Sequence, residues 1–184
     1  MKKLVLGAAM LLFAQFSFGQ AVTDQAVIPV SVTLNAILRL TVTSGGNIVF
    51  VVNTIQQYEE GIEGTARTTT KFRVSSSRDF AVTMVPENVT HFTGLETGNV
   101  ADFPITNVGY AMTAGAGAID AATIKPLAAT NSLVSNAAIG NEEYSLMWHL
   151  ATSDVVDLAT ASLLIQSIPA DIYVNNMFLT LAPQ

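Results

Sequence analysis

Cysteine is absent from this 184-residue chain. Without a thiol, the sequence can form no disulfide, no cysteine nucleophile, no CxxC redox pair and no cysteine-ligated metal site. Charged residues are also scarce, at 12%, whereas apolar residues make up 50% of the chain. This balance is the opposite of that of a disordered polypeptide. We therefore expect a folded protein that is held together by its own hydrophobic core.

Basic residues are the scarcer charge, with 8 Lys and Arg against 14 Asp and Glu. Beyond the first three residues, the positive charges are scattered singly, at Arg39, Arg67, Lys71, Arg73, Arg78 and Lys125. Binding to nucleic acid requires a basic surface that neutralises several phosphates, and no such cluster is present. The sequence therefore predicts neither a nucleic-acid partner nor an anionic membrane surface as partner.

The first nineteen residues have the layout of a secretory signal peptide. Lys2 and Lys3 precede an uncharged, apolar run over residues 4–14, and Ser17-Phe18-Gly19 supplies small residues at the cleavage positions. The run is shorter than the roughly 20 residues needed to span a bilayer, so we expect no stable membrane span after cleavage. We predict an exported protein (extracellular, cell-surface or periplasmic) that begins near Gln20 and has a net charge of −8 after Lys2 and Lys3 are lost.

The clearest pattern in the chain is a strict alternation over residues 28–42. Every even position is apolar: Ile28, Val30, Val32, Leu34, Ala36, Leu38, Leu40 and Val42. A period of two places all of these side chains on one face of an extended chain. Because typical strands have about 5–6 residues, we expect a bend or bulge near Asn35, or a crossing from one sheet to another.

Shorter alternating runs recur along the rest of the chain, over residues 48–52, 72–74, 80–84, 108–112, 144–150 and 171–181. The runs on either side of the polar residues 76–79 predict a β-hairpin. Residues 114–140 favour no single assignment, and residues 153–165 have the partial helical spacing of one short helix. Strands separated by turns predict an antiparallel sandwich or barrel. One-sided alternation favours an all-β sandwich of the Ig-like or pilin-like kind, formed by residues 20–184 as a single domain with at most one short helix.

No group of residues has the spacing of a catalytic or metal-binding site. The two histidines, His91 and His149, have no further ligands nearby in the sequence, so we interpret both as structural. The adjacent pairs Glu59-Glu60 and Glu142-Glu143 would point to opposite faces of an extended chain. Asp154 and Asp157 are too sparse for a calcium loop. We predict no catalytic residue, no metal site and no cofactor, and hence no enzyme.

Three further features have an ordinary structural interpretation. Asn88-Val89-Thr90 matches the glycosylation sequon, a triplet that often arises by chance. Trp148 shares its parity with the apolar residues of the run over residues 144–150, which predicts a core position. Tyr58, in a predicted loop over residues 58–70, is the aromatic residue that we expect to be exposed.

Two segments resemble small exported bacterial β-sandwich proteins of the pilin-like and spore-coat-like kind. They are the alternating run over residues 30–40 and the ending Ala170-Asp171-Ile172-Tyr173-Val174, which closes on residues 178–183. The resemblance covers the first and last predicted strands only. It implies a sandwich architecture without catalytic residues, and the chain lacks the disulfide that many pilin-type domains contain.

These observations favour a structural or surface protein that self-associates within an extracellular or outer-surface assembly. Strand addition at an exposed sheet edge is the expected route, to another copy or to another surface protein. The expected donor is either the segment over residues 20–27 or the C-terminal strand. The alternative is an adhesin-like or carbohydrate-binding module that binds a glycan through residues 58–70 or 114–140. An enzyme ranks third, since it would need a cleft that joins a histidine to distant acids.

Overall fold

The computed structural model describes residues 26, 28–96, 103–114, 118–119 and 123–184. Internal contacts divide the chain into two units, Met1–Leu34 and Asn35–Gln184. Residues 1–19, the predicted signal peptide, lie outside the described residues, so export stays a prediction. In the first unit, residues 28–34 have no assigned secondary structure and are exposed.

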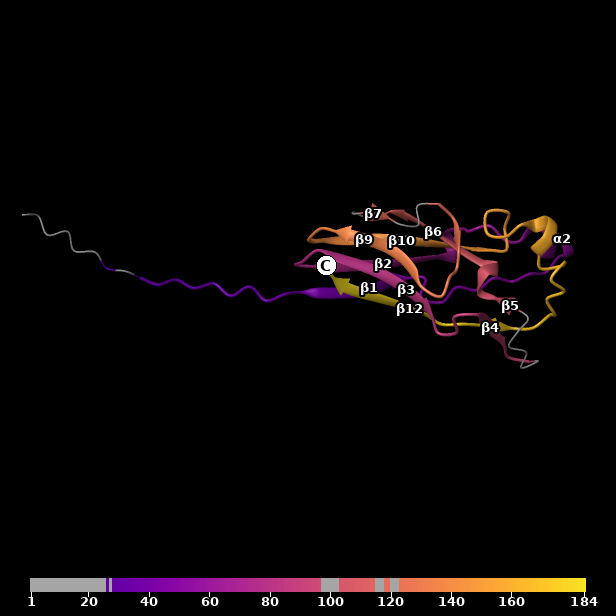
Figure 1. Ribbon diagram of the computed structural model, residues 1–184, viewed down its shortest axis with the longest axis horizontal. Coiled ribbons are helices and arrows are strands. Elements are labelled where there is room, and N and C mark those ends of the chain that lie inside the picture. The colour runs from indigo at the N-terminus through magenta and orange to yellow at the C-terminus, as the bar shows by residue number, and fades with distance from the viewer. Residues whose placement is uncertain (1–25, 27, 97–102, 115–117, 120–122) are drawn as a thin grey trace, which may run out of the picture. The chain divides into compact units, whose positions relative to one another are not determined.

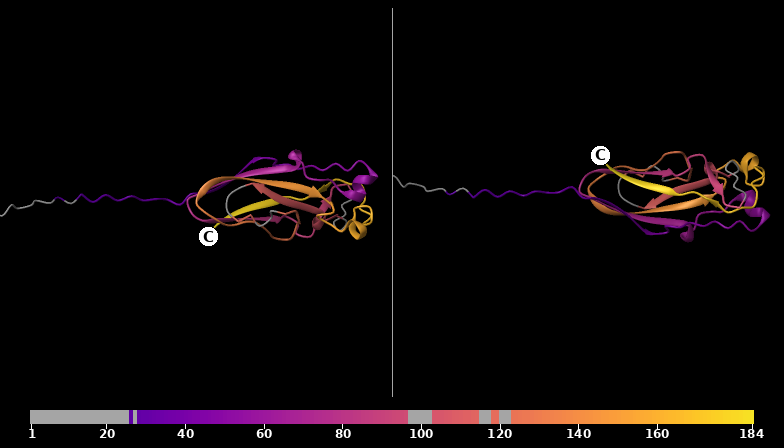
Figure 2. Two further views of the ribbon diagram at one scale, coloured as in Figure 1. Left: turned by 90° about the horizontal axis from the view of Figure 1, so that it is seen from above. Right: turned by 90° about the horizontal axis from the view of Figure 1, so that it is seen from below.

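The second unit is mostly β, with three antiparallel sheets and two short helices (Figure 1). The largest sheet has the strand order β1 (Leu38–Ser44), β2 (Thr69–Ser76), β10 (Gly140–Leu150), β6 (Val108–Ala114) and β8 (Lys125–Pro126). The second sheet has the order β12 (Met177–Pro183), β3 (Phe80–Pro86), β9 (Asn131–Ala137) and β7 (Ala118–Ile119). A small third sheet joins β11 (Tyr173–Val174), β4 (His91–Gly94) and β5 (Phe103–Pro104). The yellow strand β12 is seen most openly from below (Figure 2).

The two larger sheets contribute to one hydrophobic core. The predicted alternation is confirmed in β2 and β3, where every second residue is buried, and in β10 from Tyr144 to Trp148. The last three residues of β10 are all buried. Phe72 of β2 and Tyr144 of β10 stack with ring centroids 5.2 Å apart. The other sheet completes the core with side chains that are fully buried, among them Phe80, Val82, Met84, Leu133 and Val134. Buried aromatic and aliphatic side chains contribute about 1.5–3 kcal/mol each, so this shared core dominates the stability.

The predicted hairpin between β2 and β3 is wrong. β2 pairs with β1 and β10, whereas β3 pairs with β12 and β9, so the turn after Ser76 carries the chain from one sheet to the other. Both strands direct their apolar side chains into the same core. An arch between two sheets and a hairpin within one sheet therefore give the same alternating sequence.

The expectation of at most one short helix is also wrong, because there are two. Helix α3 (Leu158–Ala161) falls in the segment for which a helix was predicted, and Asp157 caps it. Helix α2 (Ile55–Glu60) was missed, since six residues are too few to show an apolar period. Its signal was a capping box, in which Thr54 accepts a hydrogen bond from the Gln57 amide and Gln57 accepts one from the Thr54 amide. The predicted loop over residues 58–70 also contains a 3-10 turn, Ala66–Thr68.

The long alternating run does not form one strand. Only its last five residues, 38–42, belong to β1, and the irregularity lies between Val42 and Ser44 rather than near Asn35. Residues 48–52, for which a strand was predicted, are extended and alternate in burial, yet they belong to no assigned strand. None of the backbone groups of residues 46–52 hydrogen-bonds to another described residue.

No helix in the described part of the chain is both long and apolar enough to cross a membrane.

Candidate functional site: a groove at an open sheet edge

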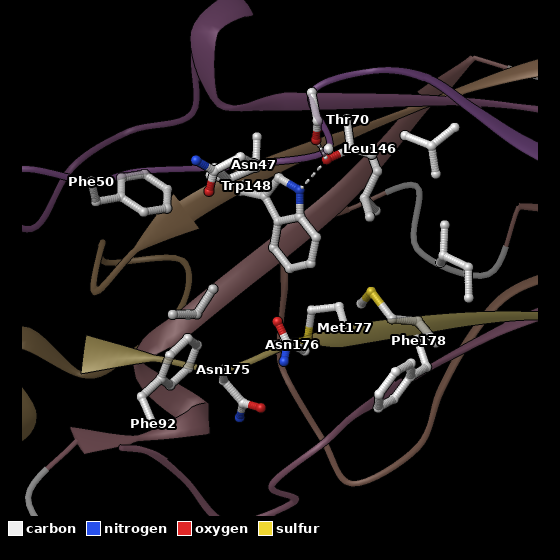
Figure 3. A pocket seen from close by; sticks show the side chains of 17 residues that line it. Asn47, Phe50, Thr70, Phe92, Leu146, Trp148, Asn175, Asn176, Met177 and Phe178 are labelled. Atoms are coloured by element: carbon white, nitrogen blue, oxygen red, sulfur yellow. Dashed lines mark hydrogen bonds between the residues drawn. The ribbon is translucent and has the colours of Figure 1, made fainter. Parts of the chain in front are cut away.

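A groove of about 450 Å³ opens between residues 45–50 and the start of β12 (Figure 3). Its floor includes Leu146 and Trp148 of β10 and Met84 of β3, so the groove reaches down to the shared core. One wall carries Ile48 and Phe50. The opposite wall carries the residues 175–179. No acidic or basic residue lines this groove.

Both walls present backbone groups that no strand in the described part of the chain pairs with. β12 pairs with β3 along one edge, and the opposite edge of β12 is the open end of its sheet. Across the groove, Ile48, Phe50 and Val52 are half-buried against the core, while the backbone of that wall is unpaired. Unpaired edges beside an apolar surface are the template for strand addition.

A chain of hydrogen bonds fixes the floor of the groove to one wall. The Trp148 indole Nε1 donates to the Thr70 hydroxyl at 3.0 Å, and that hydroxyl donates to the Gly45 carbonyl at 2.7 Å (Figure 3). Gly45 has φ +65°, and a Cβ atom there would lie 2.1 Å from the carbonyl oxygen of Thr69. This close approach requires glycine, so the position of the wall depends on Gly45.

Asparagine side chains hold together the end of the groove nearest β4. The Asn175 amide nitrogen donates to the carbonyls of Asn88, at 2.8 Å, and of His91, at 3.1 Å. The Asn176 amide nitrogen donates to the Glu87 carboxylate at 2.6 Å. These bonds join the start of β12 to the turn between β3 and β4. The polar residues at this end are therefore occupied with each other.

The apolar face of residues 28–34, which we call the arm, is uncovered. Ile28, Val30, Val32 and Leu34 are 82%, 82%, 78% and 90% exposed. The sequence predicted a strand over this segment with these side chains on one face, and the strand prediction is wrong, because residues 28–34 belong to no assigned strand. Four aliphatic side chains on one face of an extended segment are the pattern of a half-buried strand. The arm has this pattern without a partner in the described chain.

The two histidines lie in separate local networks. His149 is buried, and its Nδ1 lies 3.0 Å from the Gly64 amide nitrogen and 2.8 Å from the Glu63 carboxylate. The His91 ring contacts Thr90, whose hydroxyl donates to the Asn88 side-chain oxygen. Asn88 of the sequon is thus engaged in its own turn.

Three of the acidic residues singled out in the sequence, Glu60, Glu143 and Asp157, have structural partners. Glu60 accepts a hydrogen bond from Gln56, and Glu143 pairs with Arg73 across β10 and β2 at 3.2 Å. Burial of Tyr144, reinforced by the negative charge of Glu142, raises the pKa of the Tyr144 hydroxyl to about 12. Among the described residues, no cluster of three or more His, Asp or Glu side chains could hold a metal ion.

The predicted burial is correct for one of the two aromatic residues singled out in the sequence and wrong for the other. Trp148 is a core residue, as predicted, and is 6% exposed. Its role in the groove floor was not predicted. Tyr58, which we expected to be exposed, is half-buried and packs against the core. The sequence signal for the site was the length of the alternating run, which exceeds what one strand needs but which the sequence analysis assigns to a bend.

No protein-family model matches this sequence, and the search of curated proteins gives no match.

Proposed function

We propose that this protein is an exported, non-enzymatic structural subunit that self-associates by strand addition in an extracellular or outer-surface assembly. The observation that carries the proposal is the exposed apolar face of the arm, residues 28–34. Four large aliphatic side chains in a row are costly to leave in water, and a strand-shaped segment buries them by joining a sheet.

The groove beside β12 is the matching acceptor. It offers an apolar floor and two walls with unpaired backbone, which together correspond to the place of one missing strand. The arm has alternating side chains for the floor and an unpaired backbone for the walls. Neither the arm nor the groove lining carries a charge. This complementarity favours the arm as the donor over residues 20–27, the donor expected from the sequence. β12, the other expected donor, already uses one edge to bind β3.

Order-of-magnitude energies indicate that side-chain burial alone is insufficient. Burying four aliphatic side chains contributes about 6–12 kcal/mol at 1.5–3 kcal/mol each. Fixing the backbone of seven residues costs about 7–14 kcal/mol. Backbone hydrogen bonds, at about 0.5–1.5 kcal/mol each, must therefore supply the net stabilisation. The unpaired backbone on both sides of the groove offers those bonds, whereas a smooth apolar patch would not.

The architecture that goes with this function is a β-sandwich of the Ig-like or pilin-like kind. Support comes from the single core that the two larger sheets share and from the arch between β2 and β3. A sandwich with an open edge between β1 and β12 can accept a strand without rearranging its core.

The test exploits the two faces of the arm. Val30→Ser/Val32→Ser removes apolar contacts, while the control Ser31→Ala/Thr33→Ala changes the opposite face. Light scattering of the chain that begins at Gln20 should show assemblies for the natural and control chains and monomers for Val30→Ser/Val32→Ser. Unchanged assembly of the Val30→Ser/Val32→Ser variant would refute the arm as donor. Monomers from the natural chain at all concentrations would refute self-association.

A further inference from the structure

We infer that a second pocket, formed where the turn between β3 and β4 meets the turn between β11 and β12, binds a neutral saccharide. The pocket has a volume of about 570 Å³, within the range of pockets that bind small ligands. Among the described residues it shares only Asn175 and Asn176 with the groove. None of its described lining residues belongs to 58–70 or 114–140, the segments for which glycan binding was the alternative prediction. Strand addition neither requires nor supplies this binding function.

Hydrogen bonds between the two turns hold the pocket in shape. The Asn88 amide donates to the Asn175 side-chain oxygen at 3.1 Å, and the Glu87 amide donates to the Asn176 carbonyl at 2.8 Å. The Asn175 side-chain nitrogen uses both of its hydrogens in bonds to the carbonyls of Asn88 and His91. The pocket is therefore preorganised, which lowers the entropic cost of binding a ligand.

The bonds between the turns leave several atoms of the lining unused. The Asn176 side-chain nitrogen donates one hydrogen to the Glu87 carboxylate, so its second hydrogen and its side-chain oxygen have no partner in the described chain. The second carboxylate oxygen of Glu87 and the Thr93 hydroxyl have no partner there either. The pocket therefore offers both donors and acceptors. Hydroxyl groups, which donate as well as accept, match such a mixture.

Two valines add an apolar surface beside these polar groups. Val89 and Val174 are each 44% exposed, and both line the pocket. Val174 pairs directly with Thr93 between β11 and β4. Their side chains therefore lie on the same face of the small sheet, with Cβ atoms about 4.5–5.5 Å apart. A pyranose ring has hydroxyl groups at its rim and C–H groups on its faces, which suits a polar cluster set beside valines.

The charge of the pocket selects against acidic ligands. Among the described lining residues only Glu87 is charged. Two further acidic residues flank the same small sheet, where the Glu96 amide donates to the Asp171 carboxylate at 2.9 Å. This negative potential repels a uronate or a sulfate group. A neutral saccharide avoids the repulsion, and its hydroxyl groups can form charge-assisted hydrogen bonds to the Glu87 carboxylate.

Two other ligand classes match the pocket less well. Ca²⁺ takes roughly 6–8 oxygen ligands, and the unused oxygens of Glu87, Asn176 and Thr93 are too few to hold it without several waters. An ammonium group has only donors, so it would leave the unused hydrogen of Asn176 unpaired. A saccharide can satisfy both kinds of group at once.

A glycan array tests the class of ligand. The natural chain that begins at Gln20 should bind a subset of neutral oligosaccharides and none that consist only of uronic acids or sulfated sugars. The neutral glycan that gives the strongest signal is then titrated by calorimetry. A folded chain that binds no glycan, or only acidic glycans, would overturn the inference.

Paired substitutions then locate the site. Glu87→Gln keeps the size of the side chain and removes its charge, so it should weaken binding of that glycan about 10-fold. Its matched control, Glu96→Gln, removes a charge outside the lining and should bind like the natural chain. Thr93→Val should weaken binding about 2- to 10-fold, whereas Thr180→Val on β12 should not. With all four variants shown to be folded by thermal unfolding, natural affinity in both pocket variants would overturn the inference.

Hydrogen exchange of the natural chain gives a readout that needs no substitution. The glycan selected on the array should slow exchange of the amides of residues 87–93 and 174–176 and leave those of residues 45–50 unchanged. Slower exchange at residues 45–50 alone would place the glycan in the groove and overturn the inference. Neither result depends on whether the copies self-associate, so the proposed function stands or falls separately.

Discussion

The centre of the large sheet, on one hand, and the groove walls and the arm, on the other, share the same alternating sequence pattern with opposite outcomes. In the centre, β10 is hydrogen-bonded on both sides, by β2 and β6, and its inward side chains are buried. At the groove, β12 is the edge strand of the four-stranded sheet and is bonded only to β3, and residues 46–52 make no backbone hydrogen bond to another described residue. The arm has its apolar face exposed. The alternation specifies which side chains share a face. It does not specify whether the partner strand comes from the same chain.

The largest expected difference between the two regions comes from the same substitution made in each. Leu146→Ala in β10 removes a fully buried side chain and should lower the free energy of unfolding by about 2–5 kcal/mol. Leu34→Ala in the arm should change it by less than about 0.5 kcal/mol under conditions where the chain is monomeric. Chemical denaturation at low protein concentration measures both. Comparable losses would show that the arm is part of the subunit's own fold.

A smaller difference in stability is expected between alanine substitutions of two adjacent glycines at the groove wall. Gly45→Ala places a Cβ atom against the Thr69 carbonyl at positive φ, and should cost about 1–3 kcal/mol. Gly46→Ala meets only Val42 at 3.9 Å, an ordinary contact, and should be near neutral. Thermal unfolding, together with light scattering, should show that Gly45→Ala weakens both the subunit and its assembly. Equal effects of the two substitutions would mean that the wall is not held at Gly45.

The smallest predicted effect is a pH dependence of the unfolding free energy that arises from the buried Tyr144. Burial raises the pKa of Tyr144 from the usual 10.0 to about 12, so the folded state keeps its proton more tightly than the unfolded state. The stabilisation from this group is fully present below pH 10 and is lost as the pH rises toward 12. Tyr144→Phe should flatten the decline in unfolding free energy over that range. An identical decline in both proteins would assign it to other groups.

Periodicity predicted the central strands because the burial of one face of a strand follows directly from alternation. Phe72, Val82 and Leu146 lie where the sequence placed them. The β2–β3 connection could not be distinguished, because an arch and a hairpin around Ser77 have the same pattern. Periodicity does not predict helix α2, because its only sequence signal is the pair of capping side chains, Thr54 and Gln57.

The candidate site was only partly visible in the sequence. The run over residues 28–42 is too long for one strand, and its length alone predicts a bend near Asn35. The physical cause is different, since the first part of the run has no partner within the described chain. The groove depends on the placement of Gly45 against Trp148 and β12, both of which lie more than a hundred residues later in the chain. No local pattern encodes that arrangement.

Hydrogen–deuterium exchange of the backbone amides in the assembled protein tests strand addition most directly. Our account predicts slow exchange for the amides of residues 28 and 30–34, since Pro29 has none, and for the outward-facing amides of β12 in the assembly. Both sets should exchange fast after dissociation. The central amides of β10 should be protected in both states, which provides an internal reference. Fast exchange of the arm amides within an intact assembly would contradict the account, because it would show that the copies associate without hydrogen-bonding the arm as a strand.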